Sequence, residues 1–150
     1  MGIRGHLASL AREAIDPGWT GKDVIAIPWE EPFIDENLRL EKIFREVALA
    51  LGGQEQAPWS DHAASRRFSA RLLDGARPFG GSLLDVEEVQ ALHRHYGELD
   101  RAQLRGRAEQ VSVASRFLPH SDEVVERAER TMRLVAEAAR ANHALMVWVS

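Results

Sequence analysis

Apolar and small residues recur at regular steps through the last thirty residues of the chain. The steps alternate between three and four residues, which is the period of a helix that turns one face to a core. A second row widens the stripe on one side, which favours a long helix against a globular helical core over a coiled-coil seam. The first row is Val125, Ala128, Met132, Val135, Ala139, Asn142, Met146 and Val149, and the second is Val124, Thr131, Ala138 and Leu145. We expect Met132 and Val135 to be almost fully buried. Asn142 should be buried too, with a hydrogen bond to another helix or an interface.

The two ends of this predicted helix differ in character. Ser121 is a candidate N-cap, and acid-before-base pairs spaced four residues apart support the turns that follow. These pairs are Glu123–Arg127, Glu126–Arg130 and Glu129–Arg133. Residues 145–149 are instead apolar on every side. They should be buried in the helix, extended into a strand or covered by a partner, and we expect Trp148 to pack against residues 24–27 or a second copy of the chain.

Shorter amphipathic patterns predict further helices upstream. We expect one over residues 3–15, one over residues 35–51, and one that begins at Ser60 or Asp61. Asp85 followed by Glu88 forms a candidate capping box, and Asp100 is a candidate N-cap of a helix that Pro119 ends. The inward positions of these helices are Ile3, Leu7, Leu10, Ala14, Leu40, Ile43, Phe44, Val47, Leu51, Phe68, Leu72, Leu73, Val86, Val89, Leu92, Tyr96, Leu104, Ala108, Val111 and Leu118.

These patterns together predict the fold class. The chain should form a single helical domain over residues 1–150. We expect an all-α or nearly all-α orthogonal bundle of five or six helices. One or two short extended segments are possible, at residues 24–27 and 145–149.

Composition narrows the possible chemistry. The 150 residues include no Cys, which excludes disulfides, zinc thiolate sites and thiol nucleophiles. No apolar run is long enough for a transmembrane helix, and no signal peptide is evident, so we expect a cytoplasmic protein without a membrane association. The net charge of −4 makes nucleic acid an unlikely partner. Residues 104–118 fit a helix-turn-helix poorly, since Pro119 would truncate the recognition helix.

The histidines do not form a convincing catalytic or metal site. Ser60, Asp61 and His62 are adjacent and point in different directions, so they cannot form a triad with one another. His93 and His95 are two residues apart, which places them on different sides of a helix, and no metal site is expected. The acids between Glu30 and Glu46 should form a solvated face. We expect no cofactor and no catalytic residue.

Clustered arginines offer the best candidate ligand site. Arg67 and Arg71 share one face of a predicted helix, and Arg101 and Arg105 share a face of another. If the two faces converged, they would form an anion-binding pocket. The alternative is that each arginine is solvated or paired with a nearby acid, for which Asp74, Glu98, Asp100 and Glu109 are the candidates.

Tryptophans near predicted loops and the C-terminus are candidate interface residues. Trp29 and Trp59 lie beside Pro, and Trp148 lies in the apolar terminus. The sequence therefore favours a small cytoplasmic, non-enzymatic interaction protein, such as an immunity protein, antitoxin, chaperone-like protein or phage accessory factor. Its partner would be another protein or a second copy of itself. One alternative is a small enzyme or anion-binding domain that uses the clustered arginines with His62 or His93. A nucleic-acid-binding regulator is the second alternative.

Overall fold

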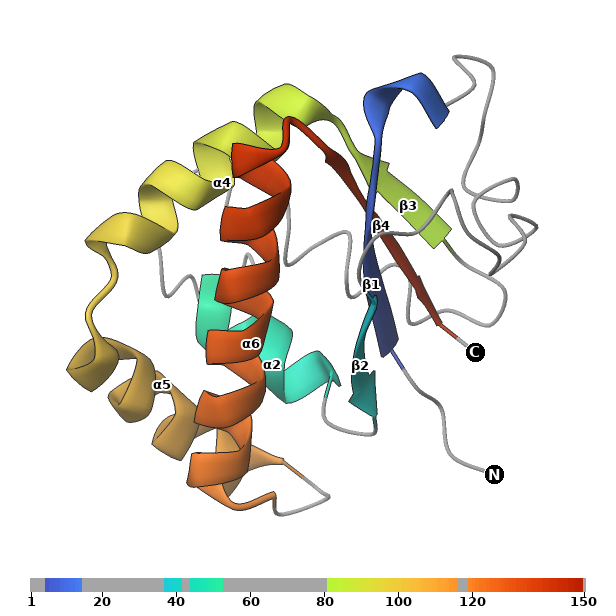
Figure 1. The fold of residues 1–150 in the computed structure, drawn as a ribbon. Coiled ribbons are helices and arrows are strands. Elements are labelled where there is room, and N and C mark those ends of the chain that lie inside the picture. Colours follow the sequence, from blue (N-terminus) through green and yellow to red (C-terminus); the bar gives the residue numbers. More distant parts are fainter. Residues whose placement is uncertain (1–4, 15–36, 42–43, 53–80, 116–118, 150) are drawn as a thin grey trace.

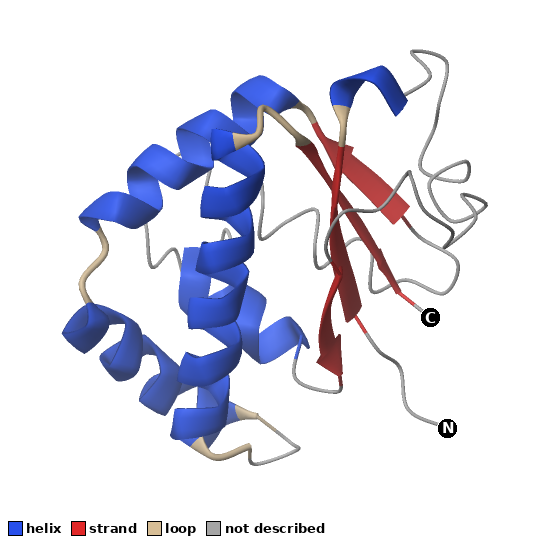
Figure 2. Ribbon diagram, viewed as in Figure 1, coloured by secondary structure: helices blue, strands red, loops and turns tan. Residues whose placement is uncertain are grey.

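A computed structural model describes residues 5–14, 37–41, 44–52, 81–115 and 119–149 of the chain. Four α-helices gather on one side of a four-stranded antiparallel sheet (Figures 1 and 2). The strands are β1 (Gly5–Leu10), β2 (Asn37–Glu41), β3 (Gly81–Leu84) and β4 (Ala144–Val149). The helices are η1 (Arg12–Ala14, a 3-10 turn), α2 (Phe44–Gly52), α4 (Val86–Glu98), α5 (Arg101–Ala114) and α6 (Ser121–Arg140).

The sheet joins segments from both ends of the chain. Its strand order is β2-β1-β4-β3, so the last strand lies between the first and third. Leu7 of β1 pairs with Val147 of β4, and Leu84 of β3 pairs with Leu145 on the other edge of β4. Residues 145–149 are therefore a strand, which was one of the outcomes predicted for them. Trp148 pairs with His6 and Gly81. The strands β1 and β3 thus occupy both edges of β4. Residues 24–27, against which Trp148 was predicted to pack, lie outside the described residues.

The helix predicted over residues 3–15 is wrong. The segment forms β1 and the short turn η1 instead. Leu7, Ala8, Ser9 and Leu10 are all buried, so both faces of this strand are covered. A strand buried on both faces shows no alternation of polar and apolar residues, and its leucine spacing resembled a helical period by coincidence.

The helix predicted over residues 35–51 is also partly wrong. Among the described residues of this segment, Asn37–Glu41 forms the strand β2 and Phe44–Gly52 is helical. Leu38 of β2 pairs with Leu7, and this pairing across the chain overrides the local helical pattern. The inward positions Val47 and Leu51 are confirmed, since both are fully buried.

The two central helices match their predictions closely. Asp85 and Glu88 form a complete capping box at the start of α4, and Asp100 and Gln103 form another at the start of α5. All predicted inward positions within the described parts of these two helices are buried, namely Val86, Val89, Leu92, Tyr96, Leu104, Ala108 and Val111. Leu118 lies outside the described residues.

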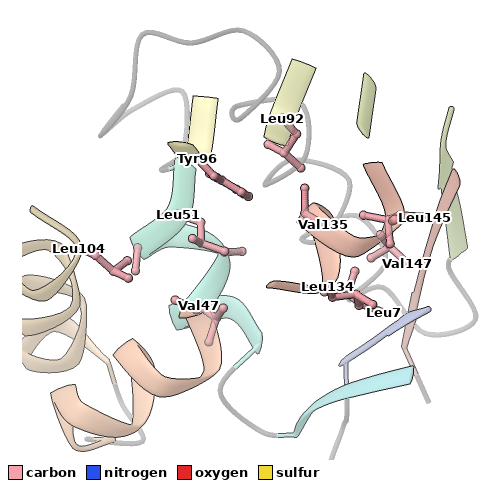
Figure 3. Packing of buried hydrophobic residues seen from close by; sticks show 14 of the residues in the cluster. Leu7, Val47, Leu51, Leu92, Tyr96, Leu104, Leu134, Val135, Leu145 and Val147 are labelled. Atoms are coloured by element: carbon pink, nitrogen blue, oxygen red, sulfur yellow. The ribbon is translucent and has the colours of Figure 1, made fainter. Parts of the chain in front are cut away.

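The long helix α6 is confirmed, with corrections at individual positions. Val135 is fully buried as predicted, whereas Met132 is only partly buried against the core. The N-cap is His120 rather than Ser121, because the His120 Nδ1 accepts a hydrogen bond from the Asp122 amide at 3.2 Å. Figure 3 shows Leu134 and Val135 of α6 in a core that also receives side chains from α2, α4, α5 and the sheet. Among the ion pairs of the described residues, none joins the glutamate and arginine of a predicted acid–base pair of α6.

The helix ends earlier than its apolar pattern suggested. Asn142 has a φ of 55° and lies just after the helix, so the prediction that it is buried on the stripe is wrong. The amides of Asn142 and His143 donate to Ala139 and Ala138 carbonyls, which is a Schellman motif with Asn in the left-handed position. The predicted hydrogen bond to another helix does form, because Gln90 Nε2 of α4 donates to Asn142 Oδ1 at 3.1 Å.

The fold class is therefore mainly helical, with a larger sheet than predicted. The described residues form four α-helices and four strands, where the pattern predicted five or six helices and at most two extended segments. None of the described helices is long and apolar enough to cross a membrane.

Candidate functional site

The candidate anion site is only half within the described residues. Arg67 and Arg71 lie outside them, as do His62, Trp29 and Trp59. Arg101 and Arg105 lie on α5, and each contacts an acid on α6: Arg101 Nε is 3.0 Å from Glu129, and Arg105 Nη1 is 2.5 Å from Asp122. The acids differ from those the sequence suggested as partners.

These two ion pairs join α5 to α6 across an exposed surface. The hydrogen bond and positive charge of Arg105 hold the pKa of Asp122 below its usual range, and the same contact raises the pKa of Arg105. Exposed ion pairs of this kind contribute little to stability because water and salt screen them. Their main effect here is to occupy the guanidinium groups that an anion would need.

His93 and Trp148 are the other candidates that the structure places. His93 is partly buried on α4. No cluster of three metal-ligating side chains occurs among the described residues. Trp148 is a strand residue of β4, paired on both sides by backbone.

A pocket lies where α5 ends and α6 begins, and we call this region the α5–α6 junction. Figure 1 shows the end of α5 and the start of α6 at the lower end of the helical layer. The pocket has a volume of about 370 Å³ and is shallow and largely open to solvent. Its lining residues are Glu109, Ser112, Val113, Pro119, His120 and Ser121.

The lining combines an exposed apolar residue with polar groups. Val113 is 82% exposed and is the large apolar side chain that stands out on the described surface. Glu109 lies one helical turn before it, exposed on the same side of α5. Pro119 and Ser121, which also line the pocket, are partly exposed. The lining therefore combines a carboxylate, the imidazole of His120, hydroxyl groups and apolar surface.

Two buried oxygens near the last turn of α5 have no hydrogen-bond partner among the described residues. One is Ser112 Oγ, on a residue that is 8% exposed and lines the pocket. The other is Oε2 of Glu46, a residue of α2 that is 5% exposed. Ser115 Oγ donates to the other oxygen of that carboxylate, Oε1, at 2.6 Å. Buried polar atoms usually have hydrogen-bond partners, so this region contains hydrogen-bonding capacity that the described contacts leave unsatisfied.

Glu46 corrects the expectation of a solvated acidic face at its position. Its neighbours Val47 and Ala48 are fully buried, and the packing of α2 against α5 carries the carboxylate inward with them. No spacing in the sequence distinguishes Glu46 from the other acids between Glu30 and Glu41. Its burial follows only from the packing of two helices that are distant in sequence.

The described ends of the two helices place negative charge at the junction. α5 has no basic residue in its last turn, so the negative end of its dipole is not neutralised from within the helix. The positive end of α6 is already met by His120 as N-cap and by Asp122 and Glu123 in the first turn. Glu109 adds a further negative charge to the pocket wall.

A second polar cluster lies at the other end of α6, which is about 30 Å away along a helix of 20 residues. Ser9 Oγ lies 3.4 Å from His143 Nδ1, and Gln90 Nε2 donates to the Ala139 carbonyl at 2.6 Å. Ser9 is only 4% exposed and its hydroxyl already contacts His143, so this contact is internal to the fold. The contacts of this cluster connect β1 and α4 to the end of α6, and we assign them a structural role.

Comparisons with known proteins yield a fold but no family. No protein-family model matches the chain, and no curated protein matches it. The chain is similar in structure to a crystal structure of the Escherichia coli protein YfbM, described as a protein of unknown function. The TM-score is 0.62 with 16% sequence identity, and the match covers 96% of this chain and 98% of the other. The likeness extends over nearly the whole fold and says nothing of activity.

Proposed function

We propose that this chain is a small cytoplasmic, non-enzymatic interaction protein that binds another protein through the α5–α6 junction. One observation carries the proposal: Val113, 82% exposed, borders a pocket whose wall contains the buried and unpartnered Ser112 hydroxyl. A single exposed valine is ordinary on a soluble protein. An exposed valine beside an unsatisfied polar pocket is what a binding surface needs, since a partner would cover the first and satisfy the second.

The arginine contacts support this function over the anion-binding alternative. Arg101 and Arg105 each contact an acid of α6. An anion would have to displace these acids, and the region also carries Glu109. The electronegative junction likewise argues against nucleic acid as the partner, because phosphate binding depends on free positive charge.

The electronegative character also favours a different protein over a second copy of this chain. In a symmetric dimer built on the junction, each Glu109 would approach the acidic junction of its mate. Like charges brought together in this way oppose association. A partner that presents positive charge meets no such penalty.

Site-specific photo-crosslinking tests the proposal. A benzophenone amino acid is placed at position 113 and, as a matched control, at position 102, where Ala102 is exposed on the first turn of the same helix. In cells of the source organism, we expect position 113 to capture one defined protein that position 102 does not. Identical capture from both positions, or a crosslink only between copies of this chain, would contradict the proposal.

Reconstitution with the purified captured protein completes the test. Val113→Asp should weaken binding at least about tenfold in calorimetry, because it places a charge in a covered apolar contact. Ala102→Asp introduces the same charge outside the junction and should leave the affinity unchanged. Equal affinities for the two variants would show that the junction is not the binding surface.

A further inference from the structure

We infer that the pocket at the α5–α6 junction receives an arginine side chain from the partner, an inference that rests on the proposed function and specifies its chemistry. The pocket lining contains several hydrogen-bond acceptors. Glu109 provides a carboxylate at the pocket wall, and Ser112 and Ser121 provide hydroxyl oxygens. A guanidinium group has five N–H donors in a fixed planar fork, which suits a carboxylate flanked by further acceptors.

The apolar part of the lining matches the rest of the same side chain. Val113 and Pro119 line the pocket together with the polar groups. Arginine buries its three methylene groups along apolar surface while its charged head reaches polar partners. One side chain would thus cover the exposed Val113 and place donors near the Ser112 hydroxyl.

The charge of the described lining residues favours a cationic ligand over an anion. Glu109 lines the pocket, and the end of α5 contributes negative partial charge without a basic residue to offset it. The nearby Arg105 is engaged by Asp122 at 2.5 Å. Among the described lining residues, a phosphate or carboxylate ligand would therefore face the Glu109 carboxylate without an arginine or lysine beside it.

The buried Ser112 hydroxyl gives an observation independent of charge. The residue is 8% exposed, lines the pocket, and its Oγ has no hydrogen-bond partner among the described residues. In the absence of a ligand such a group lowers the stability of the protein, and a donor from a ligand would satisfy it. This is the feature that separates the pocket from an ordinary acidic patch.

Titration with small probes tests the inference on the full-length protein. The probe is N-acetyl-arginine methylamide, and its uncharged isostere N-acetyl-citrulline methylamide is the control. Binding is followed by NMR through the methyl signals of Val113. We expect saturable shifts with the arginine probe and at least about tenfold weaker binding of the citrulline probe, since the contact is charge-assisted.

Two variants locate the probe. Glu109→Gln should reduce the affinity for the arginine probe about tenfold. Glu137→Gln makes the same change at an exposed position near the far end of α6 and should have no effect. Ser112→Ala should also weaken probe binding, while the free energy of unfolding without probe stays the same or rises, because the unsatisfied hydroxyl is gone.

Several outcomes would overturn the inference. These are equal binding of the arginine and citrulline probes, equal effects of Glu109→Gln and Glu137→Gln, and saturable binding of inorganic phosphate at Val113. The result is separable from the crosslinking test. A captured partner with no preference for the arginine probe would leave the proposed function standing and refute the arginine pocket. Specific binding of the arginine probe with no partner captured at position 113 would refute the proposed function and would leave a site for arginine without a protein as its source.

Discussion

The hydrogen bond between Ser115 and Glu46 offers the sharpest test of the packing between α2 and α5. Glu46 is 5% exposed, and Ser115 Oγ donates to its Oε1 at 2.6 Å. The other oxygen of this carboxylate has no partner among the described residues. Hydrogen bonds to charged groups contribute about 1.5–3 kcal/mol, and loss of one leaves the carboxylate less compensated. We therefore expect Ser115→Ala to destabilise the protein by about 2 kcal/mol.

A double-mutant cycle isolates this contact from any other that Ser115 makes. Glu46→Leu removes the buried carboxylate and should leave stability unchanged or raise it, because burial of a poorly partnered charge is costly. In that background Ser115→Ala should cost close to nothing, which gives a coupling energy of about 2 kcal/mol. Urea unfolding at neutral pH measures all four proteins. The melting temperature of Ser115→Ala should fall by about 4–8 °C for a chain of this size.

The cycle can refute the reasoning in two ways. A cost below about 0.5 kcal/mol for Ser115→Ala in the natural sequence would mean that the hydrogen bond contributes little beyond an exposed contact. An equal cost in both backgrounds would mean that Ser115 acts through other partners. A change in the denaturant slope would instead indicate altered compactness and would invalidate the comparison.

Three further predictions concern α6. Leu134 is 1% exposed, so Leu134→Ala should lower the free energy of unfolding in urea by about 2–5 kcal/mol. Met132→Ala should lower it by less, because Met132 is only partly buried. Equal losses for the two variants would contradict the buried face assigned to α6. Asn142 has a φ of 55°, so Asn142→Ala should lower the free energy of unfolding by about 1–2 kcal/mol, and Asn142→Gly should lower it by clearly less. The opposite order would show that position 142 does not adopt the left-handed conformation. The depressed pKa of Asp122 stabilises the fold above the unfolded pKa of this carboxyl, and that contribution is lost as pH falls through the folded value. Asp122→Asn should flatten this part of the acid unfolding curve, and an unchanged curve would show that the contact with Arg105 does not contribute measurably to stability.

Local features of the helices were readable from the sequence alone. The capping boxes of Asp85 with Glu88 and Asp100 with Gln103 involve groups three residues apart, so their geometry depends on the segment itself. The buried face of α6 follows in the same way, from a period that persists over many turns. In both cases the information lies within one helix, and tertiary packing agrees with it.

The sheet could not be read in this way. A strand's hydrogen-bond partners lie elsewhere in the chain, so Leu7 finds Leu38 on one side and Val147 on the other. The sequence around Leu7 allowed a helix, and burial of both faces of β1 removed the alternation that would have marked a strand. The apolar residues 145–149 signalled burial, but only the placement of β4 between β1 and β3 decided that they form a strand.

The candidate site, like the sheet, could not be predicted from local sequence. The sequence placed Glu109, Ser112 and Val113 on a helix, yet their role depends on the return of the chain at Pro119 into α6. Glu46 and Ser115 are separated by 69 positions, and nothing local marks either of them. Local sequence determined that the segments of α4, α5 and α6 are helical and which face each of them buries, because those choices rest on neighbouring residues. Tertiary structure decided which polar groups share a pocket, because that depends on distant segments packing together.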